Sequence, residues 1–132
     1  MVNPMRPRRA PRRGFTLIEL LVVLAIVALL LTLAVPRYFH SIDVSKEQVL
    51  AENLRTTRDT IDKFYGDTGR YPDSLAELVE KRYLRALPYD PVLQSASAWR
   101  IEAPESPYKG SVYNLRSSAP GSTHDGRPFA EL

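Results

Sequence analysis

The chain has 132 residues, 44% of them hydrophobic and 25% charged, which leaves room for one modest domain and excludes a second core. The formal net charge of +3 belongs to the first residues, because removing residues 1–14 takes the 18 basic residues to 13, against 15 acidic ones. Nucleic-acid binding by the remainder therefore lacks electrostatic support. With no cysteine, disulfides and thiolate chemistry are excluded as well.

Residues 1–14 are rich in proline and arginine and show no apolar periodicity, which predicts a disordered cytoplasmic leader. An apolar run follows over residues 15–35, interrupted by Thr16, Glu19 and Thr32. A helix of that length reaches about 30 Å, enough to cross a bilayer. The arginines before it predict that its N-terminal end faces the cytoplasm and that the C-terminus lies outside.

Beyond Pro36 the pattern becomes amphipathic, which predicts that the helix continues with one face packed on a domain. The apolar face consists of Leu50, Leu54, Thr57, Ile61, Phe64 and Tyr65. Because Pro36 lacks an amide hydrogen and crowds the preceding turn, a kink or local melting is expected there. Gly66 and Gly69 are expected to end the helix.

The rest of the chain predicts short elements, since most of the 11 prolines follow residue 70. A second helix is expected from Ser74 to about residue 83, capped by Asp73 or Ser74, with Glu77 at capping-box spacing from Ser74. The predicted strands are residues 98–102, residues 111–116 and a short last one at Phe129. We therefore predict an α+β fold in which a long N-terminal helix, membrane-spanning in its first half, packs on a small C-terminal antiparallel sheet.

The junction between leader and apolar run holds the most specific motif, in which Gly14 is followed by Phe15, Thr16, Leu17 and, two residues later, Glu19. It resembles the class III signal of type IV pilins and type II secretion pseudopilins. In that family a prepilin peptidase cuts after the glycine and methylates the new amine. The resemblance implies cleavage between Gly14 and Phe15, N-methylation of Phe15, and a mature chain of 132 less 14, or 118, residues.

Glu19 is the unusual residue of the apolar run. A carboxylate at the centre of a membrane helix costs about 2.5–3.5 kcal/mol on insertion scales, so we expect it to be paired. Cleavage would create a cation at the amine of Phe15, and in filaments of the resembled family that amine pairs with the glutamate of an adjacent subunit. Glu19 is therefore predicted to be an assembly residue, and Pro36 to allow local unwinding during extraction from the membrane.

The distal half also resembles one branch of this family, the G-type or major pseudopilin of type II secretion systems. The resemblance is carried by residues 65–72, 83–91, 112–117 and 125–129. It implies a non-enzymatic subunit of a short periplasmic filament that supports protein export. The implied domains are a leader (1–14), a transmembrane and assembly half-helix (15–36) and a periplasmic globular domain (37–132).

The implied partners are prepilin peptidase, further copies of the chain, minor pseudopilins, and an inner-membrane assembly platform with its ATPase. The implied location is the bacterial inner membrane, crossed once, and then the periplasmic filament. No nucleic acid and no cofactor is expected.

G-type pseudopilins often hold calcium near their last strands, but here the only acidic residues after Tyr113 are Asp125 and Glu131. Calcium is therefore not favoured, and Asp125 is its candidate ligand, with Asn114, Ser117 and Ser118 as further oxygen donors.

Three other side chains are assigned structural roles. His40 and His124 lie far apart in sequence without ligand spacing, so both are expected at the surface. Trp99 is expected to anchor a core or an interface.

Other interpretations of the apolar run remain open. It could be an ordinary secretory signal peptide cleaved near Ala34, a twin-arginine signal at Arg12 and Arg13, or a plain anchor, although its length and Glu19 argue against a usual signal core. Functional alternatives are a minor type IV pilin or competence pseudopilin that binds a partner at a filament tip, and a membrane-anchored periplasmic binding domain that never polymerises.

Overall fold

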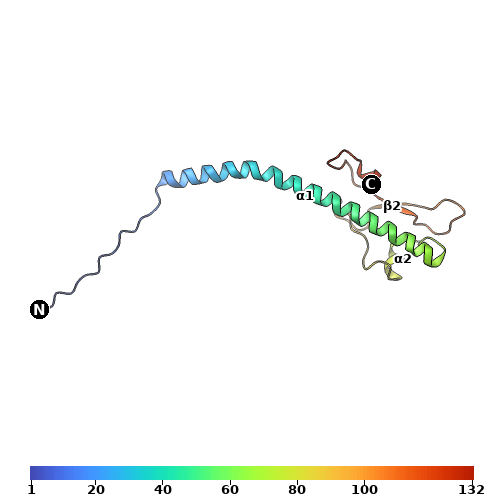
Figure 1. Ribbon diagram of the computed structural model, residues 1–132, viewed down its shortest axis with the longest axis horizontal. Coiled ribbons are helices and arrows are strands. Elements are labelled where there is room, and N and C mark those ends of the chain that lie inside the picture. Colours follow the sequence, from blue (N-terminus) through green and yellow to red (C-terminus); the bar gives the residue numbers. More distant parts are fainter. The chain divides into compact units, whose positions relative to one another are not determined.

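The computed structural model describes all 132 residues. In chain order the elements are helix α1 (Leu17–Thr68), helix α2 (Leu75–Glu80), strand β1 (Trp99–Glu102), strand β2 (Asn114–Ser117) and the 3-10 helix η1 (Phe129–Glu131), traced in Figure 1. The chain divides into two compact units, Met1–Tyr38 and Phe39–Leu132. Helix α1 contributes its first part to one unit and the remainder to the other.

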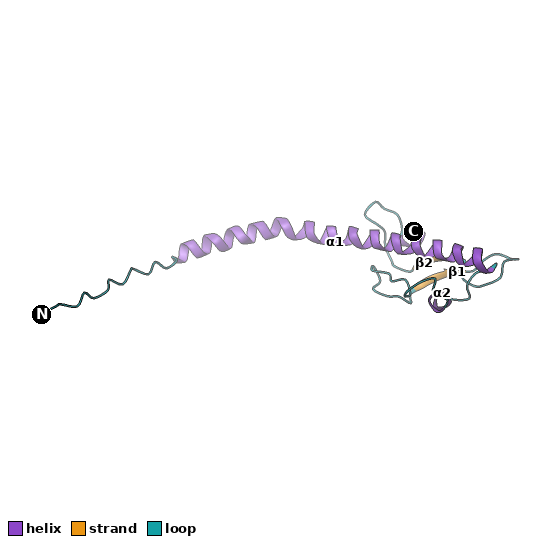
Figure 2. Cartoon of the chain, turned by 60° about the horizontal axis from the view of Figure 1, so that its bottom comes forward, coloured by secondary structure: helices purple, strands orange, loops and turns teal.

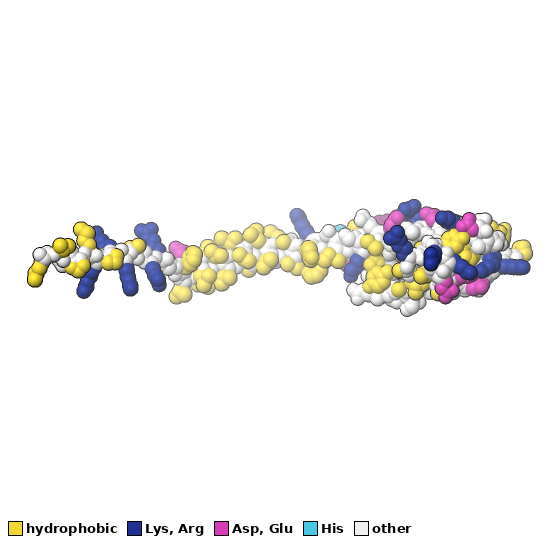
Figure 3. Space-filling view, turned by 90° about the horizontal axis from the view of Figure 1, so that it is seen from below, with side chains coloured by type: hydrophobic (Ala, Val, Ile, Leu, Met, Phe, Trp, Pro, Cys, Tyr) yellow, Lys and Arg dark blue, Asp and Glu magenta, His cyan; other side chains and the backbone are white.

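In the first unit the leader has no regular structure and α1 is apolar on all its sides. On the face seen in Figure 3, hydrophobic side chains cover the helix beyond the arginine side chains of the leader. An 18-residue window of α1 is long and apolar enough to cross a membrane, and none of it is buried within the chain. A helix that is hydrophobic all round and lacks protein around it is typical of a membrane span.

Of the two outcomes expected at Pro36, a kink or local melting, the local melting is wrong, because α1 runs through Pro36 without a break. Proline removes one hydrogen bond of the helix, the one that the carbonyl of Thr32 would otherwise accept. The turn before it is intact, and the hydroxyl of Thr32 donates to the carbonyl of Ala28 at 2.8 Å. Helical turns on both sides are therefore sufficient to hold the backbone at this position.

The second unit is built on the C-terminal part of α1. Its buried face consists of Leu50, Leu54, Thr57, Ile61 and Phe64, the positions at helical spacing that the sequence predicts. They join Leu78, Trp99, Val112, Leu115, Ala119 and Phe129 in a single hydrophobic core. The predicted α+β arrangement, a long helix packed on a small antiparallel sheet, is thereby confirmed.

The sheet has two strands, β1 and β2, paired antiparallel with Trp99 opposite Ser117 and Ile101 opposite Leu115 (Figure 2). The second strand begins later than predicted because the amides of Ser111 and Val112 both donate to the carbonyl of Pro72, at 3.1 and 2.9 Å. The strand predicted at Phe129 is wrong, since that residue opens η1 and its ring fills the core.

Glycine and a left-handed residue set the ends of both helices. Gly69, at φ 76°, follows the last residue of α1, and its amide donates to the carbonyl of Tyr65 at 2.8 Å, whereas Gly66 stays helical. Ser74 caps α2 as predicted, its hydroxyl accepting from the amide of Glu77 at 3.2 Å. Helix α2 ends at Glu80, earlier than expected, because Arg82 adopts the left-handed conformation at φ 64°.

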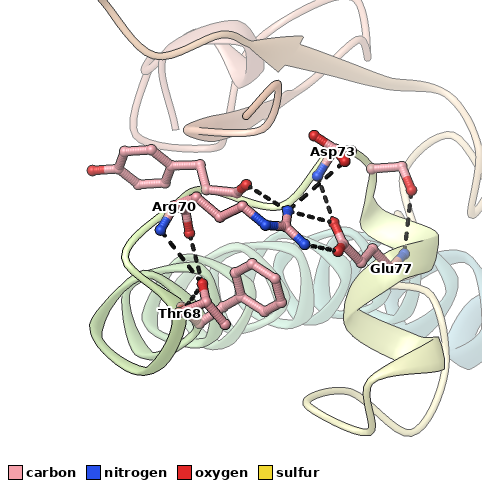
Figure 4. Close-up of polar contacts among 7 residues, drawn as sticks. Thr68, Arg70, Asp73 and Glu77 are labelled. Atoms are coloured by element: carbon pink, nitrogen blue, oxygen red, sulfur yellow. Dashed lines mark hydrogen bonds and ion pairs between the residues drawn. The ribbon is translucent and has the colours of Figure 1, made fainter. Parts of the chain in front are cut away.

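Arg70 fixes the segment between the two helices (Figure 4). Its guanidinium forms an ion pair with Glu77, donates to the carbonyl of Tyr71 at 3.2 Å and lies 5.2 Å from the centre of the Phe64 ring. Glu77 also accepts from the amide of Asp73 at 2.7 Å. The hydrogen bond from Arg70 holds the pKa of Glu77 below its usual value. The carboxylate thus stays charged and ties α2 to the end of α1.

The loop before β1 is held by a buried carboxylate. Asp90 is 1% exposed and accepts from the amides of Val92 and Leu93, at 2.9 and 3.1 Å, and from the hydroxyl of Ser117 at 2.6 Å. Trp99 donates from its indole to the carbonyl of Pro88 at 2.9 Å. Trp99 is therefore a core anchor, one of the two roles expected, and the loop is fastened to β2.

The C-terminal segment is tied back to α1 at two points. Arg58 donates to the side chain of Asn114 at 2.8 Å and to a main-chain oxygen of Leu132 at 2.6 Å. Glu47 accepts from the backbone amide of His124 at 2.8 Å and contacts its ring nitrogen at 2.5 Å. This hydrogen bond raises the pKa of His124 above its usual value.

Truncating the core face of α1 should destabilise the second unit. Leu54→Ala removes a side chain that is 1% exposed and leaves a cavity, so the free energy of unfolding should fall by about 2–5 kcal/mol in chemical denaturation. Val49→Ala, on the exposed side of the same helix, is the matched control and should change it by no more than about 0.5 kcal/mol. Equal losses of stability in the two variants would contradict the assignment of Leu54 to the core.

The His124–Glu47 pair predicts stability that decreases as the pH rises. Because the folded-state pKa of His124 is raised, its contribution is complete below the unfolded value of about 6.5 and is lost as the pH rises through the folded-state pKa. The temperature of thermal unfolding should therefore be lower at a pH above the folded-state pKa of His124 than at a pH below about 6.5. Glu47→Gln should diminish this difference. His40→Asn, which changes an exposed imidazole, should leave the dependence intact.

Candidate processing and assembly site

The predicted cleavage point lies in an exposed, irregular part of the chain. Gly14 and Phe15 precede the first turn of α1, and Phe15 is 93% exposed. A Cβ placed on Gly14 would meet no atom within 4 Å, and its φ lies outside the left-handed region. Nothing in the fold therefore requires glycine at this position. A requirement for glycine would have to come from an enzyme that reads the segment.

Thr16 and Glu19 form a reciprocal capping box at the start of α1. The hydroxyl of Thr16 accepts from the amide of Glu19 at 3.2 Å, and a carboxylate oxygen of Glu19 accepts from the amide of Thr16 at 3.3 Å. The carbonyl of Thr16 then accepts the first helical bond, from Leu20 at 3.2 Å. These bonds satisfy amides that would otherwise lack partners at the helix end.

The capping box uses one carboxylate oxygen of Glu19. Oxygen Oε2 is bonded to Thr16, whereas Oε1 has no partner in the chain and the residue is exposed. An acidic group in the first turn is also favoured by the positive end of the helix dipole. The arrangement therefore holds a carboxylate near the helix start with one oxygen available to a cation from outside the chain.

The structure brings together some of the predicted site residues and leaves others apart. Glu19 contacts Thr16, and no hydrogen bond joins it to Phe15. Pro36 is 17 residues further along the same helix, about 25 Å at the usual rise, and belongs to no common site with Glu19. The sequence interpretation missed the role of Thr16, although Thr and Glu three residues apart are the usual signal of a capping box.

The calcium candidate lies in the loop after β2. One oxygen of Asp125 accepts from the hydroxyl of Thr123. Of the other proposed donors, Asn114 bonds Arg58 and Glu102, and Ser117 bonds Asp90. These side chains thus have partners of their own, and no three His, Cys, Asp or Glu residues gather as metal ligands. The interpretation that calcium is not favoured here, with Asp125 as its candidate ligand, stays a prediction.

The comparisons with known proteins agree with the N-terminal geometry. A family model described as the prokaryotic N-terminal methylation motif matches residues 9–35, which contain Gly14, Phe15, the capping box and the apolar part of α1. A processed and methylated N-terminus is thus what this stretch resembles, in preference to an ordinary signal peptide. No solved structure gives a significant match.

Similar curated proteins come from several bacteria. Type II secretion system core protein G of Klebsiella michiganensis is 31% identical over 100 residues, covering 64% of this chain and 70% of the relative, and that of Pseudomonas aeruginosa has the same identity and coverage. Type IV major pilin protein PilA of Myxococcus xanthus is 34% identical over 77 residues, 58% of this chain and 34% of that longer protein. Because the chain covers 70% of a core protein G to which it is 31% identical, it belongs to the family of type II secretion system core protein G.

Proposed function

We propose that the chain is a pseudopilin, a subunit that polymerises into the short periplasmic filament of a type II secretion system and so supports protein export. The observation that carries this proposal is an apolar helix that is exposed on every side and begins just after a glycine–phenylalanine junction. The glutamate in its first turn takes part in the N-terminal capping box. The proposed role is structural and not enzymatic. Similarity to several proteins named core protein G favours this role over that of a minor pilin.

The first step of the proposed mechanism is processing. A prepilin peptidase cuts between Gly14 and Phe15, removes the leader and methylates the new amine of Phe15. The exposed, irregular backbone there supports this step, because a peptidase needs an extended substrate strand. Since cleavage leaves Thr16 and Glu19 in the chain, the capping box can persist in the mature protein.

The second step is pairing between subunits. The new ammonium of Phe15 on one subunit meets the free oxygen Oε1 of Glu19 on its neighbour. Neither charge is stable alone in a medium of low dielectric constant, so each favours the assembled state. Because the carboxylate is fixed by its bond to Thr16, the contact also sets the axial register of adjacent helices.

The third step is transfer from membrane to filament. The chain waits in the inner membrane with its leader end in the cytoplasm and residues 37–132 in the periplasm, as the arginines before the span favour. An inner-membrane platform with its ATPase, together with minor pseudopilins, supports extraction. Apolar α1 then exchanges lipid for the helices of neighbours, and the missing hydrogen bond at Pro36 lowers the resistance to local unwinding there.

Gly14→Val should block processing without disturbing the fold. The new side chain meets nothing in the structure, so α1 and the globular unit should stay intact, while the peptidase should leave a precursor that keeps all 132 residues. Intact mass and N-terminal sequencing of membrane-extracted protein give the result. Met5→Val, within the exposed leader, is the control and should be processed normally. Wild-type processing of the Gly14 variant would refute cleavage at this junction.

Glu19→Ala should be processed yet fail to assemble. The substitution leaves the ammonium of Phe15 without an ion-pair partner, and an uncompensated buried charge costs about 3–5 kcal/mol. Glu19→Gln separates the two roles of the residue, because an amide oxygen still accepts from Thr16 while the charge is lost. Filaments sheared from cells should be absent for both variants, and Glu19→Asp should recover some. Normal filaments from Glu19→Gln would show that capping, and not charge pairing, is what assembly needs.

A further inference from the structure

A hollow of about 530 Å³ on the second unit combines aromatic rings with carboxylates. Its lining includes Tyr71, Tyr108, Tyr113, Glu102 and Glu105. The loop between β1 and β2, which supplies most of these residues, lies beside the C-terminal end of α1 (Figures 1 and 2). The processing and pairing steps described above do not use this hollow.

The aromatic part of the hollow is organised around Tyr71. Its ring stacks on Tyr65 with centres 4.6 Å apart and makes edge contacts with Tyr113 and Tyr108, at 5.3 and 6.1 Å. The amide of Tyr71 donates to the carbonyl of Lys109 at 2.9 Å, and Gly110 packs so closely that a Cβ there would collide with the Tyr71 carbonyl. The hollow is therefore formed in the isolated chain and needs no rearrangement to receive a ligand.

The charges of the hollow select a cation. Glu102 already forms an ion pair with Arg116 at 2.6 Å, so its side chain lines the hollow but its charge is largely neutralised within the chain. The carboxylate of Glu105 has no partner in the chain, and Tyr108 and Tyr113 are 54% and 51% exposed. Tyrosine ring faces attract guanidinium and ammonium groups, and an adjacent carboxylate reinforces that attraction. A basic side chain is the class of ligand that fits.

The same unit carries an unpaired basic turn after α2. Lys81, Arg82 and Arg85 are exposed and form no ion pair, in contrast to Arg70 and Arg116. Arg82 is held at φ 64°, a conformation that non-glycine residues rarely adopt. A polymer of identical subunits is built from heterologous contacts, in which one patch meets a different patch on the next copy. The hollow and the basic turn are such a complementary pair.

We propose that the hollow of one subunit receives the guanidinium of Arg82 from a neighbouring copy, beside Glu105 and over the rings of Tyr108 and Tyr113. This contact rests on the proposed function, because it needs the chain to polymerise. It joins globular units, whereas the Glu19 contact joins membrane helices. The partner is a second copy of this chain because the basic turn and the hollow are both surfaces of the one sequence.

Charge reversal tests the contact in cells that express the full chain. Arg82→Glu and Glu105→Arg should each reduce filament yield by about fivefold or more, since each places like charges opposite one another. The double variant restores the opposite signs in exchanged positions and should recover filaments. Arg127→Glu, which reverses an exposed charge in the C-terminal loop, should leave the yield unchanged. Normal filaments from both single variants would overturn the proposal.

Crosslinking supplies a readout that does not depend on charge. The chain has no cysteine, so Arg82→Cys and Glu105→Cys in one chain introduce its only two thiols. Oxidation of assembled filaments should give a ladder of covalent oligomers, and each single-cysteine variant should give no ladder. A filament without the ladder overturns the Arg82 contact and leaves the pseudopilin proposal standing. If the unmodified chain forms no filament, the proposed function fails instead.

Discussion

The reciprocal hydrogen bonds between Thr16 and Glu19 are the interaction on which the N-terminal half depends. A carboxylate within the apolar run of a membrane-crossing helix is costly unless it is paired. The capping box satisfies one oxygen inside the chain and leaves the other for a cation. The same residue can therefore begin the helix in the precursor and join subunits after processing. Capping the helix requires only that the side chain of Glu19 accept a hydrogen bond, whereas the proposed pairing with a neighbouring subunit requires its negative charge.

Helix α1 serves two different environments within one element. Up to Pro36 its apolar side chains face every direction, and from Leu50 onward a single face is buried. The first pattern suits lipid or a bundle of identical helices, and the second suits a protein core. One continuous helix carries both patterns, so the change between them falls within an element and not at a break in the backbone.

Periodicity and motif were sufficient to predict the long helix, its buried face, the α+β class and the Ser74 cap. What the sequence did not predict depends on contacts distant in the chain. The second strand is shorter because two of its predicted residues bond Pro72, and the last strand is a 3-10 helix because the ring of Phe129 turns into the core. His124 is exposed, as expected, but the sequence did not predict its hydrogen bond with Glu47, 77 residues away. Such pairs have no local signature.

Helices that are apolar all round pack against one another in many registers, since lipid-like surfaces carry little directional information. A filament therefore needs directional contacts to define one arrangement. The proposed pairing of Glu19 with a neighbouring amine would fix how far one helix slides along the next. It leaves rotation about the helix axis weakly defined, because both groups lie close to one end of α1. A second contact, between globular units, would restrict that rotation, and the proposed contact of the Arg82 turn with the tyrosine hollow is of this kind.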